Sequence, residues 1–258
     1  MWDIETNPSA NRLLAALPRR DYLKVLGSLE PVSLRFGEVL YEPGDRIRHV
    51  YFPDNSLVSL LTVVDGRLAL EVGLIGHEGM VGIPIALGVA DTSVRALVQG
   101  GGTAMRMTAA RLKAALPRIA ALRRELLGYI NVLMAQVSQT AACNRFHVVE
   151  ARLARWLLMT RDRVNSGQFR LTQEFLARML GVRRVGVTLA AGELQRRGLI
   201  SYYRGNIRIL DDCGLEDASC RCYTAVSGAP GPKANSALAA RRAKPRAEVK
   251  SSRNLHHG

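Results

Sequence analysis

The chain is poor in cysteine and has no long apolar run. Its 258 residues include four cysteines, Cys143, Cys213, Cys220 and Cys222, with none earlier in the sequence. A chain of this length with so few thiols is not a disulfide scaffold. No segment approaches the ~20 apolar residues of a membrane span, and the mean hydropathy is +0.02. The start lacks the basic and apolar stretches of a secretory signal, so we expect a cytoplasmic protein with no membrane partner.

Motifs of the common enzyme classes are also absent. The sequence has no phosphate-binding P-loop, no Gly-x-Ser-x-Gly and no zinc-binding helix motif. Glu71, Glu78 and Asp91 are scattered among turn signals, where a solvated carboxylate is the simpler interpretation. The sequence therefore predicts no catalytic residue and no enzyme.

Positive charge is concentrated in one part of the chain. The formal net charge is +14 and the sequence pI is about 10.4. Residues 1–144 are nearly neutral, whereas residues 145–210 hold 13 basic and 4 acidic side chains. This asymmetry indicates a polyanionic partner, most simply nucleic acid. A solvated basic face without a partner is the alternative that charge alone leaves open.

The sequence between residues 31 and 107 is typical of short strands. Apolar segments alternate with turn signals, and Asp65-Gly66 favours a tight hairpin because glycine adopts positive φ without steric cost. Many short strands with closely spaced turns predict an antiparallel sandwich or roll.

From Thr108 the period becomes helical. Thr108 predicts an N-cap for a helix over 109–116, and beyond Pro117 apolar residues follow 3–4 spacing for more than three heptads. We interpret this pattern as a dimer seam in which Gln136 and Thr140 set the register; packing of the helix on its own domain is the alternative. The predicted seam comprises Leu122, Leu126, Tyr129, Leu133, Gln136 and Thr140.

Residues 171–200 carry the strongest functional signal. Thr172 is placed to cap a short helix, and Gly181 can adopt the left-handed conformation that ends a helix. A second helix is predicted to begin near Arg183. Two helices joined by a glycine turn within about twenty residues are typical of the helix-turn-helix motif.

A hairpin is predicted directly after these helices. Alternating segments flank Arg204-Gly205-Asn206, where Gly-Asn is a tight-turn signal and Arg204 is suited to phosphate contact. The whole predicts a winged helix-turn-helix. Such a domain can also bind proteins, but the basic charge of the region and Arg183-Arg184 at the head of the second helix favour DNA.

This order of elements resembles the CRP/FNR family of bacterial transcription regulators. The resemblance is carried by FGEVLYEPGD at 36–45, HVYFP at 49–53, GHEGMVG at 76–82 and RLARWLL at 152–158, and it covers residues 31–212. It implies an α+β protein with an N-terminal antiparallel β-roll like the cyclic-nucleotide-binding jelly roll. The expected parts are a helical leader (1–30), the sensor β-roll (31–107), a dimerisation helix (108–146), a winged helix-turn-helix DNA-binding domain (147–212) and a disordered basic tail (213–258).

The resemblance also implies specific DNA contacts. The first motif helix would hold phosphate at its N-terminus, and Arg184 corresponds to an arginine that can bind guanine O6 and N7. Val185 and Leu189 stand where the best-known members have a glutamate and a second arginine, so base preference does not carry over. The predicted DNA-binding residues are Thr172, Gln173, Arg183, Arg184, Val185, Thr188 and Arg204.

The roll departs from the nucleotide-binding pattern that the resemblance implies. Members that bind cyclic nucleotide use a glutamate for the ribose and an arginine for the phosphate. Here Ile83 stands at the position of the glutamate, directly after Gly82, and Thr92-Ser93 stand at the position of the arginine and its neighbour. Arg95 is three residues from Thr92, so in a strand its side chain points to the opposite face. We therefore expect the effector pocket at Gly82, Ile83, Thr92 and Ser93 not to bind cyclic nucleotide in the usual mode, and the effector stays unknown.

No metal site is predicted. An iron–sulfur cluster needs several cysteines near the N-terminus, and the chain has none before Cys143. Haem would need an axial ligand such as His77, but a single histidine in a glycine-rich turn is more often a surface residue. The spacing Cys213-x6-Cys220-x-Cys222 resembles no metal motif. We interpret these cysteines as ordinary thiols, with a redox response as the alternative.

The sequence thus predicts a homodimeric, sequence-specific transcription regulator. The expected partners are double-stranded DNA, a second copy of the chain, RNA polymerase and an unknown small-molecule effector. The alternative is a small-molecule-sensing adaptor whose basic half binds an acidic protein rather than DNA.

Overall fold

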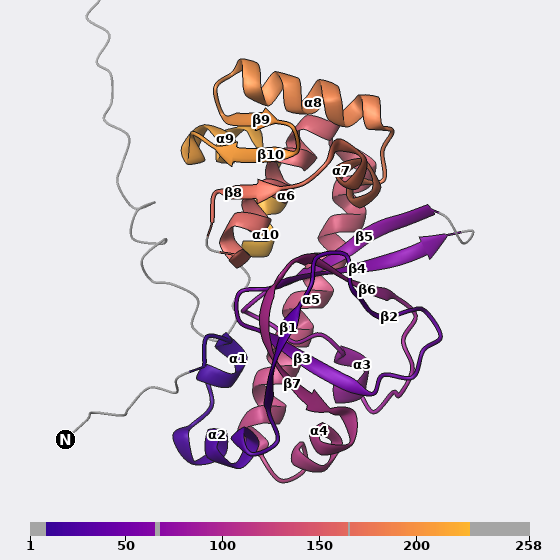
Figure 1. Ribbon diagram of the computed structural model, residues 1–258, viewed down its shortest axis with the longest axis vertical. Helices are drawn as coiled ribbons and strands as arrows, with labels where there is room; N and C mark the ends of the chain where they lie inside the picture. The colour runs from indigo at the N-terminus through magenta and orange to yellow at the C-terminus, as the bar shows by residue number, and fades with distance from the viewer. Residues whose placement is uncertain (1–8, 65–67, 165, 228–258) are drawn as a thin grey trace, which may run out of the picture.

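The protein has the predicted order of β-roll, long helix and winged helix-turn-helix (Figure 1). The computed structural model describes residues 9–64, 68–164 and 166–227. Within these ranges, none of the helices has the length and apolar character needed to cross a bilayer. The α+β class predicted from the sequence is confirmed.

Two antiparallel sheets, with strand orders β1-β7-β3 and β2-β6-β4-β5, form the roll. Their inward side chains, among them Val50, Phe52 and Val98, are fully buried in one core. Short helix α3 (Ile83–Ala86) lies between β5 and β6, and the predicted Asp65-Gly66 turn lies outside the described residues. The strands are β1 (Glu30–Leu34), β2 (Val39–Tyr41), β3 (His49–Pro53), β4 (Leu57–Val64), β5 (Leu68–Ile75), β6 (Arg95–Gly100) and β7 (Gly102–Thr108).

Two short helices, α1 (Arg12–Ala15) and α2 (Arg19–Leu26), precede the roll. Asn11 caps α1: its Oδ1 accepts from the backbone N–H groups of the first turn, and its Nδ2 donates to the carbonyls of Pro53 and Gly79, both at 2.9 Å. One buried side chain therefore starts the helix and attaches it to the roll. The described part of the leader is helical as predicted, and residues 1–8 lie outside the description.

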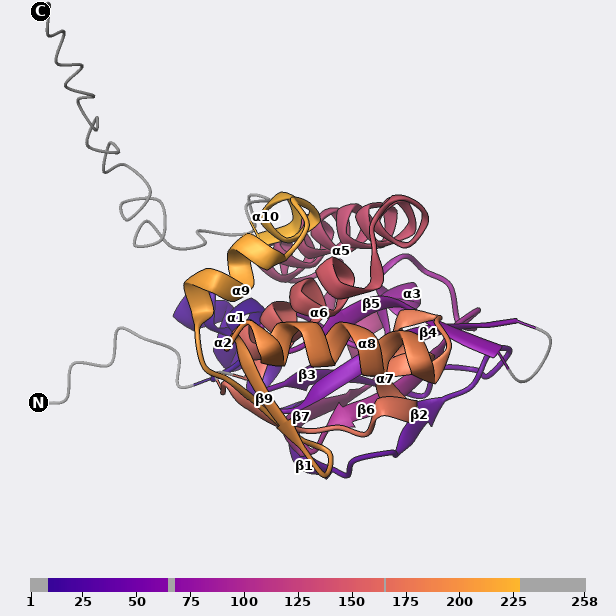
Figure 2. The same cartoon turned by 90° about the horizontal axis from the view of Figure 1, so that it is seen from above.

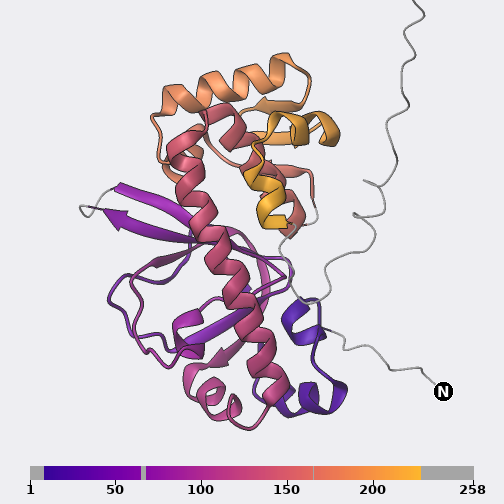
Figure 3. The same cartoon turned by 180° about the vertical axis from the view of Figure 1, so that it is seen from behind.

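Helices α4 (Ala109–Ala115) and α5 (Ala120–Phe146) follow the roll. Thr108 caps α4 as predicted, because its hydroxyl accepts from the N–H of Arg111. Helix α5 runs for 27 residues along the back of the molecule and reaches both the roll and the C-terminal domain (Figure 3). Its length makes it the element that connects the two ends of the chain.

The prediction that one stripe of α5 forms a dimer seam is wrong. All six predicted residues are buried within the single chain, and we call them the buried stripe: Leu122, Leu126, Tyr129, Leu133, Gln136 and Thr140. Tyr129 packs against Gly79 of the roll so closely that a Cβ there would lie 2.2 Å from its ring Cζ. Helical periodicity reports that a stripe is buried but not what covers it. The alternative, packing of the helix on its own domain, is the one that the structure shows.

The two polar residues of the buried stripe have intramolecular partners. Strand β5 lies at the edge of its sheet, so its outer backbone groups lack a strand partner. Gln136 supplies one: its Oε1 accepts from Leu74 N–H at 2.8 Å, and its Nε2 donates to Leu74 carbonyl at 3.2 Å. Thr140 accepts from Arg155 at 3.1 Å. These residues satisfy buried polar groups of their own chain rather than set a register between subunits.

The C-terminal domain begins with α6 (Val149–Val164), and its small sheet has the order β8-β10-β9. Helix α8 buries Val187, Ala190, Ala191 and Leu194 in the domain core, as predicted. The remaining elements are β8 (Gln168–Arg170), α7 (Gln173–Leu180), α8 (Arg184–Arg196), β9 (Ile200–Tyr203) and β10 (Asn206–Ile209).

The prediction of a disordered tail from residue 213 is wrong for its first part. Residues 212–227 form α9 (Asp212–Ala218) and α10 (Cys222–Ser227), and α10 packs against α5. Asp211 caps α9, while Leu215 and Tyr223 are buried in the core of the C-terminal domain. Composition failed here because a few buried residues suffice to order a short polar segment against an existing surface. Residues 228–258 lie outside the description.

A buried polar contact joins the roll to α6. Glu71 of β5 accepts from the indole N–H of Trp156 at 2.9 Å and from the Ser59 hydroxyl at 2.7 Å. Burial raises the pKa of Glu71 to about 7, although these two hydrogen bonds and the charges of Arg155 and Arg163 act in the opposite direction. The carboxyl group is therefore half protonated near neutral pH in the folded protein.

We expect this carboxyl group to make the free energy of unfolding depend on pH. Because the folded pKa of about 7 lies above the ordinary value of 4.5, the folded state binds the proton more tightly and loses stability as pH rises between these values. The loss is on the order of 3 kcal/mol and is complete above the folded pKa. Denaturant unfolding at stepped pH measures it. Glu71→Gln should remove this slope, whereas Asp217→Asn, at an exposed acid on α9, should keep it.

Candidate nucleic-acid interface

Helices α7 and α8 are joined by the sharp turn that the sequence predicts. The Thr172 hydroxyl accepts from Phe175 N–H at 3.1 Å and so starts α7. Gly181 ends it in the left-handed conformation with φ of 61°. A Cβ at this glycine would lie 2.6 Å from Leu70 Cδ1 of β5, so both the backbone and the neighbouring hairpin favour glycine. The helix-turn-helix geometry therefore follows from local residue types.

Helix α8 lies at one end of the molecule, and from that end it is not covered by another described element (Figure 2). Arg183 is its N-cap residue, Arg184 opens the helix, and both side chains are exposed. Val185 and Leu189 are 61% and 70% exposed on the same helix, which is unusual for large apolar side chains. Charged residues at the head and apolar residues along the face suit a helix that enters a DNA groove.

Thr188 links the two helices of the motif. Its hydroxyl lies 2.8 Å from Oε1 of Gln173 at the start of α7, and 3.1 Å from the Arg184 carbonyl in its own helix. These two residues are therefore held in place before any ligand arrives. Gln173 also lines a small hollow between α7, α8 and the hairpin, together with Thr172, Arg184, Tyr202, Arg204 and Gly205.

The hairpin turn is one residue shorter than the predicted Arg204-Gly205-Asn206 connection. Tyr203 pairs with Asn206, so Arg204 and Gly205 are the two central residues, with Arg204 at the tip as predicted. Both have positive φ, 48° and 83°, as the hairpin turn with matching twist requires. Arginine seldom adopts this conformation, so the turn holds Arg204 at the tip in a strained backbone geometry. Its guanidinium lies 5.2 Å from the Tyr203 ring centroid.

The arginines of α8 differ in whether an acid neutralises them. Arg196 and Arg197, at its C-terminal end, pair with Glu193 and Glu150 at 2.6 and 2.7 Å. Within the described ranges, Arg183, Arg184 and Arg204 form no ion pair. Uncompensated positive charge therefore gathers at the head of α8 and at the hairpin tip, beside the hollow. This arrangement attracts an anion such as phosphate.

The seven residues predicted to bind DNA lie on these neighbouring elements. Six are exposed, and Gln173 is half-buried through its contact with Thr188. Leu189 was not among them, although its position on the face of Arg184 and Val185 follows from helical spacing. Tyr203 is 67% exposed beside Arg204 and was not predicted, because the sequence of a short hairpin strand does not indicate which of its side chains face solvent.

The four predicted effector residues lie in the roll and not in the helix-turn-helix motif; some are buried inside the roll and others are at its surface. Gly82 precedes α3 with φ of 102°, and a Cβ there would lie 2.8 Å from Val50 Cγ1. Ile83 opens α3 and packs on the roll core. Thr92 is buried in a local hydrogen bond with Val94, and Ser93 is exposed.

The chain is similar to a known domain family and to several solved structures. Residues 151–218 match the Crp-like helix-turn-helix domain family. The fold is similar to FixK2 from Bradyrhizobium japonicum, at 14% identity and a TM-score of 0.64, covering 74% of this chain and 98% of that one. It is also similar to CLP from Xanthomonas campestris, described as a c-di-GMP responsive global regulator, at 18% identity and a TM-score of 0.59, covering 74% and 99%. No curated protein matches the chain.

Residues 151–218 are a Crp-like helix-turn-helix domain. A CRP-family transcriptional regulator from Thermus thermophilus shares the fold at 20% identity, with a TM-score of 0.59 over 73% of this chain and 96% of that one. The predicted resemblance to the CRP/FNR family is confirmed by this domain and by the fold. Together they support a DNA-binding transcription regulator.

We expect Arg184→Ala to reduce discrimination between DNA sequences by about 1–3 kcal/mol, because a bidentate contact with guanine would be lost. Arg204→Asn, which removes the charge but tolerates positive φ, should weaken binding to all sequences alike. Arg196→Ala is the matched control, since Glu193 already neutralises this arginine. Competition binding with a selected site and its single-base variants measures each effect. If Arg184→Ala weakens every sequence equally, Arg184 contacts phosphate rather than a base.

Proposed function

We propose that the protein is a homodimeric, sequence-specific transcription regulator that reads the DNA major groove with α8. The observation that carries this proposal is the group of exposed, unpaired arginines at the head of α8 and at the hairpin tip. In a two-fold dimer the two copies of α8 would enter successive major grooves about 34 Å apart.

The electrostatics of the motif favour DNA over an acidic protein. Arg184 and Arg204 line a hollow that also contains the N-terminus of α7, where N–H groups and the helix dipole attract phosphate, and Arg183 directly precedes Arg184. Val185 and Leu189 add exposed apolar side chains that can contact the methyl group of thymine. Phosphate contacts would orient the domain, and the face of α8 would supply specificity.

A different stripe of α5 suits a dimer interface. We call it the exposed stripe: Leu127, Asn131, Met134, Ser138 and Ala141 follow alternating 4–3 spacing and all are exposed. Leu127 is 47% and Met134 is 60% exposed, on the side of the helix roughly opposite the buried stripe. Heptad spacing of exposed apolar residues, with small neighbours such as Gly128 and Ala135, favours close packing against a second α5.

The roll is proposed to lack cyclic-nucleotide binding of the usual kind. Ile83 offers no acceptor for a ribose hydroxyl, and Gly82 is buried within the roll. Arg95 does not replace the missing arginine, because it pairs with Glu42 at 2.7 Å. RNA polymerase and a small-molecule effector stay predictions.

The test of DNA binding is a gel shift with a pool of random duplexes at two salt concentrations. Each phosphate contact adds about 0.9 to the slope of log affinity against log salt. With Arg183, Arg204 and one helix N-terminus contacting phosphate in each subunit of a dimer, we expect about 10³-fold weaker binding at 200 mM than at 50 mM salt. Tight binding of an acidic protein, with no DNA binding at low salt, would instead establish the adaptor function.

We expect Leu127→Asp and Met134→Asp to weaken the dimer by about 10–100-fold or more while the chain stays folded, because both side chains are exposed. Leu126→Asp and Leu133→Asp should unfold the protein instead, since each places a charge in the core. Leu23→Asp, at an exposed leucine on α2, is the matched control. Sedimentation equilibrium and circular dichroism separate the two outcomes. A wild-type protein that is monomeric at all concentrations would rule out this interface.

A further inference from the structure

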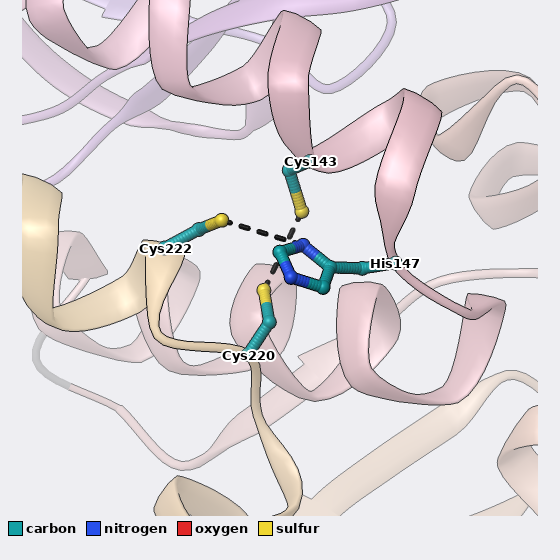
Figure 4. A group of neighbouring side chains, drawn as sticks. All are labelled: Cys143, His147, Cys220 and Cys222. Carbon is teal, nitrogen blue, oxygen red and sulfur yellow. Dashed lines mark hydrogen bonds between the residues drawn. The ribbon is translucent and has the colours of Figure 1, made fainter.

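Three thiols and an imidazole meet where α5 joins α6 (Figure 4). Cys143, His147, Cys220 and Cys222 each direct one ligand atom to a common point, and these four atoms all lie within 4.8 Å of one another. Cys143 Sγ is 3.4 Å from Cys220 Sγ, and Cys222 Sγ is 3.4 Å from His147 Nδ1. The three cysteines are buried, whereas His147 is on the solvent side.

The residues come from two segments that are distant in sequence. Cys143 and His147 are four residues apart at the end of α5, where helical spacing places both on one face. Cys220 lies two residues before α10 and Cys222 is its first residue, and α10 packs against α5. The spacing of Cys213, Cys220 and Cys222 predicts no metal site, because two of the four ligands come from a distant segment and Cys213 is exposed outside the cluster.

The separations suit one small ion. A tetrahedral zinc ion with Zn–S bonds of about 2.3 Å holds its sulfur ligands about 3.8 Å apart, which is close to the observed contacts. Three cysteines and one histidine are a common ligand set of closed structural zinc sites. Thiolate and imidazole ligands in tetrahedral geometry select zinc over magnesium or calcium, which prefer oxygen.

The electrostatic surroundings favour an anionic site. Arg152 and Arg155 are buried on α6, and Nε of each and Nη1 of Arg155 have no hydrogen-bond partner. Neither forms an ion pair within the described ranges, although Glu71 is close enough to Arg155 to feel its charge. Three thiolates around a divalent cation carry one net negative charge, which compensates a buried guanidinium.

A further contact resembles the outer shell of a metal site. The Gln139 amide donates to Cys222 Sγ at 2.9 Å from the neighbouring turn of α5. Such hydrogen bonds orient a thiolate ligand and stabilise its charge. The cluster therefore has four convergent ligands, a positively charged surrounding and a supporting donor.

We propose that Cys143, His147, Cys220 and Cys222 bind one zinc ion, which holds the α9–α10 segment against the end of α5. This site goes beyond DNA binding and does not depend on it. The ion would connect the C-terminal segment to the joint between the long helix and the DNA-binding domain. Binding releases the protons of those thiols that are still protonated.

The first test uses the full-length protein, stripped of metal and reduced, and titrated with Co²⁺ in the absence of DNA. Tetrahedral thiolate ligation of cobalt gives visible absorption bands, which should saturate at one equivalent per chain and disappear when Zn²⁺ is added. Cys220→Ser and Cys222→Ser should weaken binding at least about 100-fold. Cys213→Ser is the matched control and should bind as the wild type does.

A second measurement covers the case in which a variant fails to fold. Zn²⁺ should raise the Tm of the wild-type protein and of Cys213→Ser by several degrees, and should not raise that of Cys220→Ser. Protease digestion of the wild type should show residues 212–227 protected by Zn²⁺.

Four outcomes would overturn the proposal. The first is a wild-type protein that binds less than a tenth of an equivalent of Co²⁺, and the second is a Cys213→Ser variant that loses as much metal affinity as Cys220→Ser. The third is a purified protein that contains two iron atoms per chain. The fourth is a Cys143–Cys220 disulfide that persists under reducing conditions. Failure of DNA binding would leave these readouts unchanged, because none of them contains DNA.

Discussion

The packing of α5 against its own chain is the constraint on which the rest of the structure depends. The buried stripe covers the roll at one end and the joint with α6 at the other. Gln136 replaces the missing strand neighbour of β5 at Leu74, so the helix also satisfies the edge of a sheet. Because this face is used within the chain, a partner subunit has to use another. The exposed stripe has the spacing and the apolar residues that such a partner needs.

The roll and the DNA-binding domain meet through a shared apolar core and a set of buried and part-buried polar contacts. Glu71 binds Trp156, Arg163 pairs with Glu78 at 2.8 Å, and the ring of His77 lies 2.9 Å from the Arg163 carbonyl. Such contacts depend on orientation more strongly than apolar packing does. A change within the roll that shifts β5 would therefore disturb α6, and through it the position of α8. This physical connection gives the roll and the DNA-binding domain a shared set of interactions.

The proposed zinc site lies beside the same joint. His147 follows the last turn of α5, and α6 begins two residues later, so metal binding would restrict the segment where the two domains could move relative to each other. The buried Arg152 and Arg155 lie on α6 next to this cluster, and Arg155 also reaches Thr140 of the buried stripe. The metal ligands, the joint and the long helix are thus parts of one packed region.

Local features of the protein could be predicted from its sequence. The caps at Thr108 and Thr172, the left-handed turn at Gly181 and the exposed arginines at the head of α8 depend on residues within a few positions of one another. The roll of short strands and the winged motif could be predicted for the same reason, since turn chemistry and periodicity are local properties. The hairpin turn is one residue shorter than predicted, because Arg204 adopts a positive φ that arginine seldom takes and Asn206 pairs with Tyr203.

What covers each surface was decided only by the tertiary structure. Periodicity showed that α5 has a stripe to bury, but an intramolecular and an intermolecular partner give the same pattern, and here the roll covers it. Cys143 and Cys220 are 77 residues apart, so no spacing rule joins them; they meet because α10 packs on α5. The order of residues 212–227 depends on that same packing. Contacts between distant segments follow from how the helices and sheets fit together, and a sequence records this fit only indirectly.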